Sequence, residues 1–141
     1  MPLPIREVMT SPVRTLREDQ TLLEAIAFLH EHKIRHLPVV DAQGRLVGVV
    51  TDRDVKRASP SALVPAQREV WEKVVKETRL GKLMTRTPIT LKPTDRVTSA
   101  VRTFVDERIG CLPVLEGERL VGIVTARDLF KAMLKILEKH G

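Results

Sequence analysis

The chain contains the same short phrase twice. Residues 48–54 read GVVTDRD, and residues 122–128 read GIVTARD. The flanking residues repeat in the same order, including Met9-Thr10 with Met84-Thr85, Thr15-Leu16 with Thr90-Leu91, and Leu37-Pro38-Val39 with Leu112-Pro113-Val114. A unit repeated in this way usually cannot bury its apolar face alone. The sequence therefore predicts two copies of one unit that fold together, and it directs the search for function to the clefts that two facing copies create.

Each repeat shows the pattern of a β-α-β-β-α unit. In the first, apolar residues recur at helical spacing from Leu22 to Leu29, and β-branched runs at 37–40 and 46–50 flank a turn. The predicted fold class is α/β (α+β), with two such repeats in tandem. The predicted divisions are repeat 1 at 1–58, an inserted linker at 59–80 and repeat 2 at 81–141.

Two helices lie outside the shared pattern. The inserted linker carries an apolar stripe through Trp71 and Val75, which predicts an amphipathic helix that packs on the repeats, covers a cleft or contacts a second copy. The closing helix of repeat 2 is extended, and its predicted core stripe includes Leu129, Met133 and Ile136.

Composition and charge narrow the classes of protein to which this chain can belong. A chain of 141 residues with 43% apolar and 30% charged residues is typical of a globular protein. It has no apolar run long enough to cross a membrane, no recognisable leader and a single cysteine, so we expect a cytoplasmic protein without membrane association. The net charge of +6 is dispersed and aromatic residues are only 3%, which disfavours nucleic-acid binding.

No catalytic or metal motif is present. The sequence lacks a phosphate-binding glycine loop, a dinucleotide fingerprint and a paired-histidine zinc motif, so we expect no enzyme activity and no catalytic residue. The nearby His30, His32 and His36 fall on different faces or elements, so no metal site is expected. Cys111 lies in an apolar strand, which favours a small core residue.

The repeated Thr-x-x-Asp phrase has two interpretations. Thr51 with Asp54, and Thr125 with Asp128, are typical of helix capping, which requires no ligand. The same groups also suit a nucleotide, because a hydroxyl can donate to a phosphate and a carboxylate can accept from the two hydroxyls of a ribose. The repetition of the arginine within the phrase and of the glycine before it favours the second interpretation, since capping requires neither.

With these motifs in order and repeated, each unit resembles a CBS domain, and the two together resemble a CBS pair, or Bateman module, over residues 5–58 and 80–133. The resemblance implies that the two repeats pack through their sheets about a pseudo-twofold axis. It also implies that they leave two clefts, which bind AMP, ADP, ATP or S-adenosylmethionine as a regulatory ligand. It also implies a homodimer and an unidentified protein partner that the module regulates. An interaction module without bound nucleotide is the alternative function.

The resemblance also implies which residues contact the ligand. In the first repeat they are Thr10, Val13, Arg35, His36, Leu37, Pro38, Thr51, Arg53 and Asp54, and in the second Thr85, Pro88, Ile89, Cys111, Leu112, Pro113, Thr125, Arg127 and Asp128. The aspartates are expected to hold ribose hydroxyls, the threonines to contact phosphate or ribose, and the backbone near each Leu-Pro to line the adenine pocket.

The two repeats differ before the Leu-Pro pair. Arg35 and His36 stand where the second repeat has Gly110 and Cys111. A guanidinium suits phosphate, so we expect the cleft with Arg35 to prefer the more highly phosphorylated ligand, although both basic side chains are also explained as ordinary solvated residues. Because histidine titrates near neutrality, that cleft is expected to weaken as the pH rises.

Overall fold

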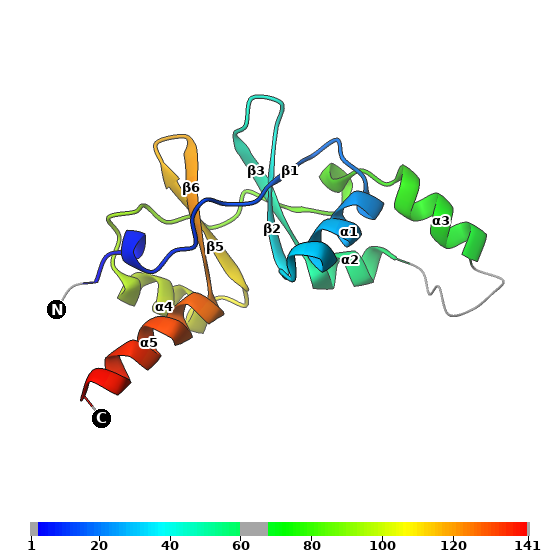
Figure 1. Cartoon of the computed structure of the whole chain (residues 1–141). Helices are drawn as coiled ribbons and strands as arrows, with labels where there is room; N and C mark the ends of the chain where they lie inside the picture. Colours follow the sequence, from blue (N-terminus) through cyan, green and yellow to red (C-terminus); the bar gives the residue numbers. More distant parts are fainter. Residues whose placement is uncertain (1–2, 60–67, 141) are drawn as a thin grey trace. The chain divides into compact units, whose positions relative to one another are not determined.

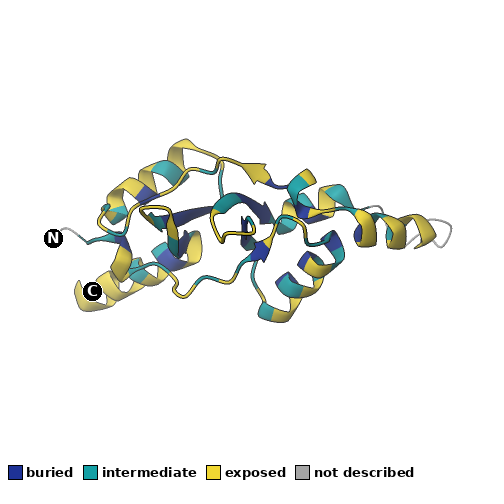
Figure 2. Ribbon diagram, turned by 90° about the horizontal axis from the view of Figure 1, so that it is seen from above, coloured by how far each residue is buried: buried dark blue, intermediate teal, exposed yellow. Residues whose placement is uncertain are grey.

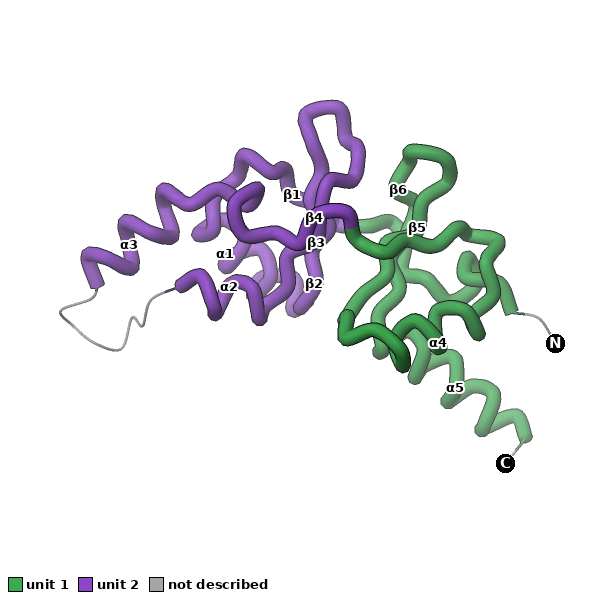
Figure 3. Tube along the Cα trace, turned by 180° about the vertical axis from the view of Figure 1, so that it is seen from behind, with its two compact units in different colours: residues 1–13, 88–141 green, residues 14–87 purple. Residues whose placement is uncertain are grey.

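The computed structural model describes residues 3–59 and 68–140, which form two compact units. Unit 1 combines residues 1–13 with residues 88–141, and unit 2 comprises residues 14–87. Figure 3 shows the two units in separate colours. The first residues of the chain therefore belong to the same unit as residues 88–141.

Unit 2 is built on a mixed four-stranded sheet. Its elements are β1 (Leu16–Arg17), α1 (Leu22–His32), β2 (His36–Val40), β3 (Leu46–Thr51), α2 (Asp52–Ala58), α3 (Arg68–Glu77), the 3-10 helix η3 (Leu80–Lys82) and β4 (Thr85–Arg86). The strand order is β1-β2-β3-β4. Figure 1 shows β2 and β3 with α1 and α2 next to them. β1 runs parallel to β2, and the other neighbours are antiparallel.

Unit 1 repeats this arrangement with fewer strand residues. Its elements are the 3-10 helix η1 (Ile5–Glu7), α4 (Val97–Asp106), β5 (Cys111–Glu116), β6 (Arg119–Thr125) and α5 (Ala126–His140). The β5–β6 hairpin is antiparallel. The counterpart of β1 is a single parallel bridge from Leu91 to Val114, and the counterpart of β4 is a single antiparallel bridge from Thr10 to Ile123. The predicted mixed α/β class with two repeated units is confirmed.

The repeats and the compact units divide the chain differently. The Met-Thr segment that opens the second repeat forms β4 on β3, the last strand of the first repeat. The Met-Thr segment that opens the first repeat pairs with β6, the last strand of the second. Each compact unit therefore contains the opening segment of one repeat together with the strands and helices of the other.

Each unit has its own apolar core. Leu22, Leu37 and Val50 are fully buried in unit 2, and Leu112 and Val124 are fully buried in unit 1. Apolar residues at i, i+3 and i+4 on α1 and α4 supply the helical side of each core, and alternating strand residues supply the other. Complete burial of a leucine or valine side chain contributes about 1.5–3 kcal/mol to stability.

The inserted helix α3 belongs to the core of unit 2. Val75 is fully buried, Trp71 and Val74 pack against the same cluster, and α3 contacts α1. Of the roles expected for this helix, packing on a repeat is the one that these contacts support. Residues 60–67 of the predicted linker lie outside the described residues.

The closing helix α5 differs from its predicted pattern. Leu129 packs on the core of unit 1, but Met133 and Ile136 are about half exposed. Figure 2 shows most of this helix in the colour of exposed residues. The expectation that both residues are core residues was wrong, because the helix continues beyond the sheet that buries its first turns.

No helix among the described residues has the length and apolar character needed to span a membrane.

Candidate functional site

In unit 2, Thr51 and Asp54 form a complete capping box at the junction of β3 and α2. The Thr51 Oγ1 accepts a hydrogen bond of 3.2 Å from the Asp54 amide, and Asp54 Oδ2 accepts one of 2.9 Å from the Thr51 amide. Asp54 is half-buried. We call Thr51 and Asp54 the Asp54 group. Strand β3 ends at Thr51, and α2 begins at the next residue. The hydroxyl of Thr51 accepts the hydrogen bond of a backbone amide in the first turn of α2, which has no carbonyl partner within the helix.

In unit 1, the equivalent residues at the junction of β6 and α5 form a different network. Asp128 Oδ2 accepts hydrogen bonds from the Thr125 amide at 2.8 Å and from Thr125 Oγ1 at 3.2 Å. Asp128 Oδ1 accepts a hydrogen bond of 2.8 Å from Thr10 Oγ1. Asp128 is only 9% exposed. We call Thr10, Thr125 and Asp128 the Asp128 group.

Arg35 and His36 lie beside the Asp54 group. His36 opens β2 directly opposite Thr51 in β3, and the Arg35 carbonyl accepts a hydrogen bond of 2.9 Å from the Asp52 amide. Arg35 is exposed and His36 is half-buried. Burial lowers the pKa of His36 below its ordinary 6.5, and the positive charge of Arg35 adds to this, while the nearby Asp52 opposes it. His36 is therefore neutral at pH 7.

This lowered pKa corrects the expected pH response of the site. A cleft that weakens as the pH rises through neutrality requires a charged His36 there, and burial removes that charge. At pH 7 the positive charge next to the Asp54 group comes from Arg35, and any contribution of His36 charge to ligand binding is confined to more acidic solution.

His36 also predicts a pH dependence of stability. Its pKa is lower in the folded chain than in the unfolded chain, so the unfolded chain binds the proton first as the pH falls below about 6.5. Native protein should therefore lose stability on acidification from pH 7.5 to pH 5.5, with a slope of at most about 1.4 kcal/mol per pH unit from this one proton. Chemical denaturation of native protein and of His36→Gln checks this: the slope should be smaller in the variant, and equal slopes would contradict it.

The structure regroups some of the predicted ligand-binding residues. Thr10, predicted to contact the ligand of the first repeat, pairs with Ile123 of β6 and bonds to Asp128. Val13 ends the same opening segment of unit 1. Both residues therefore belong to unit 1, although they open the first repeat.

The second opening segment is divided in a similar way. Thr85, predicted to contact the ligand of the second repeat, pairs with Val49 in β3 of unit 2. Pro88 and Ile89 belong to unit 1. Thr85 and Ile89 are exposed.

The remaining residues that were predicted to bind the ligand differ in how far they are buried. The side chains of Leu37, Pro38, Leu112 and Pro113 are fully buried, so only their backbone is left to meet a ligand. Cys111 is also buried. The arginines of the repeated phrase, Arg53 and Arg127, are exposed on α2 and α5.

The sequence did not predict the contact that holds each opening segment in place, which is a methionine packed against a glycine. A Cβ on Gly48 would stand 2.6 Å from Sδ of Met84, and a Cβ on Gly122 would overlap Sδ of Met9. The glycines therefore let the methionines lie directly against β3 and β6. The signal was present in the sequence as the repeated glycine and the repeated Met-Thr, but nothing linked the two.

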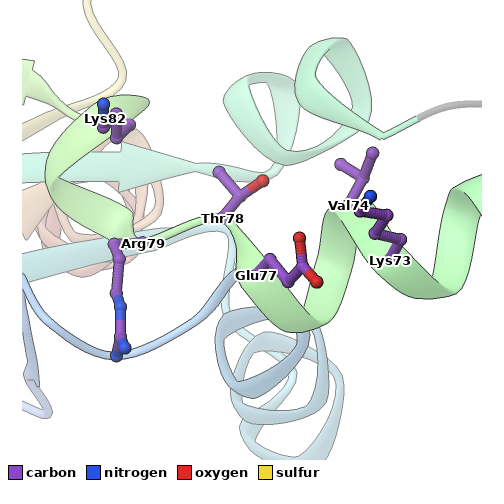
Figure 4. Close-up of a pocket in the computed structure, with 6 residues that line it drawn as sticks. All are labelled: Lys73, Val74, Glu77, Thr78, Arg79 and Lys82. Atoms are coloured by element: carbon purple, nitrogen blue, oxygen red, sulfur yellow. The ribbon is translucent and has the colours of Figure 1, made fainter.

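A separate cavity lies at the end of α3. It has a volume of about 320 Å³ and is lined by Lys73, Val74, Glu77, Thr78, Arg79 and Lys82 (Figure 4). None of the residues predicted to bind a ligand lines it. Across residues 3–59 and 68–140, no three His, Cys, Asp or Glu side chains are placed to hold a metal ion.

The sequence and the fold of this chain both match known proteins of one family. A sequence model of the CBS domain matches residues 5–61 and 80–135. A CBS domain-containing protein of Dictyostelium discoideum is 33% identical over 135 residues, which cover 95% of this chain and 93% of that protein. The homoserine O-acetyltransferase of Methanococcoides burtonii is 32% identical over 126 residues, but these cover only 23% of the enzyme.

Solved structures show the same fold. The CBS-pair protein CBSX2 of Arabidopsis thaliana matches with a TM-score of 0.84 and 26% identity, over 98% of this chain and 99% of that one. CBSX2 has also been solved in complex with AMP. The CBS domain pair of MJ0100, solved with 5′-methylthioadenosine and S-adenosyl-L-methionine, matches with a TM-score of 0.78 and 28% identity, over 94% of this chain and 97% of that one. The two repeats of this chain, with their Thr-x-x-Asp junctions between strand and helix, are CBS domains, and the chain belongs to the CBS domain family.

Proposed function

We propose that this chain is a regulatory module that binds an adenosine-containing nucleotide and reports its presence to a partner protein. The observation that carries the proposal is the Asp54 group. Its threonine hydroxyl and one of its carboxylate oxygens face no other partner among the described residues. Support also comes from two related CBS pairs, one solved with AMP and one with S-adenosyl-L-methionine.

The chemistry of the group fits a nucleoside. A carboxylate oxygen without a protein partner can accept hydrogen bonds from adjacent ribose hydroxyls, and bonds to a charged group are stronger than bonds between neutral groups. Arg35, exposed beside Thr51, supplies a permanent positive charge for a phosphate. The backbone of the buried Leu37-Pro38 step in β2 would line the adenine pocket.

The proposed role is sensing, in the reducing cytoplasm that a single cysteine suits, and it does not include catalysis. A bound ligand changes the behaviour of a module only if it binds one of two states more tightly than the other. The partner protein would then distinguish the liganded state from the empty one.

Thermal unfolding with a set of ligands tests this proposal. The protein is heated with AMP, ADP, ATP, S-adenosylmethionine or GTP. A ligand at about one hundred times its dissociation constant stabilises a protein by roughly 2.7 kcal/mol, which raises the midpoint by about 5–15 °C. We expect a rise with adenosine compounds and none with GTP. No rise with any compound would instead favour an interaction module without bound nucleotide.

We also propose that the chain forms a homodimer through unit 1. An apolar face lies on the neighbouring helices α4 and α5, and its exposed residues are Val101, Val105, Phe130, Met133, Leu134, Ile136 and Leu137. An exposed cluster of this kind is typical of an interaction surface. A second copy suits it, because one apolar patch can cover its equivalent about a twofold axis.

Light scattering after size-exclusion chromatography tests the dimer. Phe130 is 64% exposed at this face, so Phe130→Glu should disturb no core packing but should shift the protein towards the monomer, because it buries a charge in the interface. Lys131→Gln, an exposed change of one charge on the same helix, is the matched control and should stay dimeric. A native protein that is monomeric at its highest soluble concentration would contradict the proposal.

A further inference from the structure

The two aspartate groups differ in how many of their polar atoms are already used. In the Asp54 group, Thr51 Oγ1 accepts from the Asp54 amide, so its single hydrogen remains available to a ligand. Asp54 Oδ2 accepts from the Thr51 amide, and among the described residues nothing donates to Oδ1. The group therefore offers one donor and one acceptor.

The Asp128 group has no carboxylate oxygen without a hydrogen bond and no threonine hydrogen left to donate. The hydrogen of Thr125 Oγ1 is donated to Asp128 Oδ2, which also accepts from the Thr125 amide. The second carboxylate oxygen accepts from Thr10 Oγ1 at 2.8 Å. A ribose that approached Asp128 would therefore compete with the Thr10 hydroxyl for this oxygen.

The two groups also differ at the threonine of the opening segment, although its backbone pairing is equivalent in the two units. Thr10 exchanges two backbone hydrogen bonds with Ile123, of 2.8 and 3.1 Å, and Thr85 pairs in the same way with Val49. Of these two threonines, only Thr10 donates its hydroxyl to an aspartate among the described residues. Its bond is to a carboxylate that is 9% exposed, and a buried charge that loses a partner is costly.

We propose that the Thr10 hydroxyl acts as an internal latch on Asp128, so that the chain binds one adenosine nucleotide, at the Asp54 group, while the Asp128 group stays closed. The inference rests on the proposed function, since it assigns that function to one of two equivalent groups. It also makes Thr10 the residue that sets the number of ligands per chain. Release of the latch would give a second site.

Calorimetric titration with AMP tests the latch. Native protein should bind one AMP per chain, with any second site weaker by roughly ten- to a hundredfold, the range expected for a hydrogen bond to a charged group. Thr10→Val keeps the shape of the side chain and removes its hydroxyl, so two AMP should bind per chain. Thr10→Ser restores a hydroxyl and should return the stoichiometry to one.

Thr85→Val is the matched change in unit 2 and should add no site, because Thr85 makes no bond to Asp54 that could be released. Two AMP of similar affinity in native protein, or a single AMP in Thr10→Val, would overturn the latch while leaving the proposed function standing. No AMP bound by any of these proteins would overturn both.

The unfolding midpoint of Thr10→Val reports whether this variant folds. If it folds poorly, a second pair of variants tests the latch. In the native background, Asp54→Asn should weaken AMP binding by roughly ten- to a hundredfold, whereas Asp128→Asn should weaken it much less. Equal losses in the two variants would overturn the latch.

Discussion

Gly48→Ala is expected to lower the free energy of unfolding by about 1–3 kcal/mol, the usual cost of an added methyl group in a packed interior. Gly48 lies in β3 with a strand on each side, paired with Val39 and Arg86. A Cβ there would stand 2.6 Å from Sδ of Met84 and 2.8 Å from the carbonyl oxygen of Thr85. That oxygen belongs to the backbone of β4, and Met84 is buried, so neither atom can move away freely.

Two other glycines provide comparisons for this result. At Gly122 the three nearest atoms all belong to the side chain of Met9, which is only half-buried, so Gly122→Ala should cost less. At Gly81 no atom lies closer than 3.5 Å, so Gly81→Ala should change the stability by no more than about 0.5 kcal/mol. Chemical denaturation measures all three. Equal stability of Gly48→Ala and Gly81→Ala would show that the close packing of Met84 does not constrain β3.

Asp54→Ala is expected to weaken the binding of AMP by roughly ten- to a hundredfold, because the ribose hydroxyls lose a charged acceptor. The substitution also removes the capping bond from Asp54 Oδ2 to the Thr51 amide. Loss of such a cap costs about 0.5–2 kcal/mol of stability, so the variant should remain folded with a lower unfolding midpoint.

Asp52→Ala is the matched control for this loss of binding. Asp52 lies on the same turn of α2 and carries the same charge, and its ion pair with Lys56 is long, at 3.9 Å, and exposed. Such a pair contributes little to stability. Calorimetry should show a much smaller loss of AMP affinity for Asp52→Ala than for Asp54→Ala. Similar losses in both variants would mean that net charge, and not a bond to the ribose, determines affinity.

The secondary structure could be predicted because each repeat carries its own pattern. The apolar spacing from Leu22 to Leu29 corresponds to α1, and the β-branched runs on both sides of the turn at 41–44 correspond to β2 and β3. The repeated phrase marks the same strand-to-helix junction at Thr51 and Thr125. These features depend on neighbouring residues alone, so one sequence is enough to locate them.

The partner of each opening segment could not be predicted. Methionine packs against glycine in both units, and the motif has the same residues in both repeats. The sequence is therefore equally compatible with Met84 on Gly48 and with Met84 on Gly122. Only the path of the chain in three dimensions selects the exchanged arrangement, and that arrangement moves Thr10 to Asp128.

The electrostatic properties of the site also depend on the fold. Histidine in isolation predicts a charge change near neutrality, but the burial of His36 lowers its pKa. In the same way, identical Thr-x-x-Asp motifs predict equivalent groups, while the hydroxyl of Thr10 satisfies only Asp128. A motif specifies which polar atoms are present, and tertiary packing decides which of them are still available to a ligand.

The location of a bound nucleotide tests the central claim most directly. A crystal structure of the protein with AMP should show the ribose hydroxyls about 2.6–3.2 Å from the carboxylate of Asp54, the range of a hydrogen bond, with the Thr51 hydroxyl donating to the ligand. AMP bound away from Asp54, for example in the basic cavity beside Lys73 and Arg79, would contradict the account. So would crystals that hold no AMP at saturating concentration.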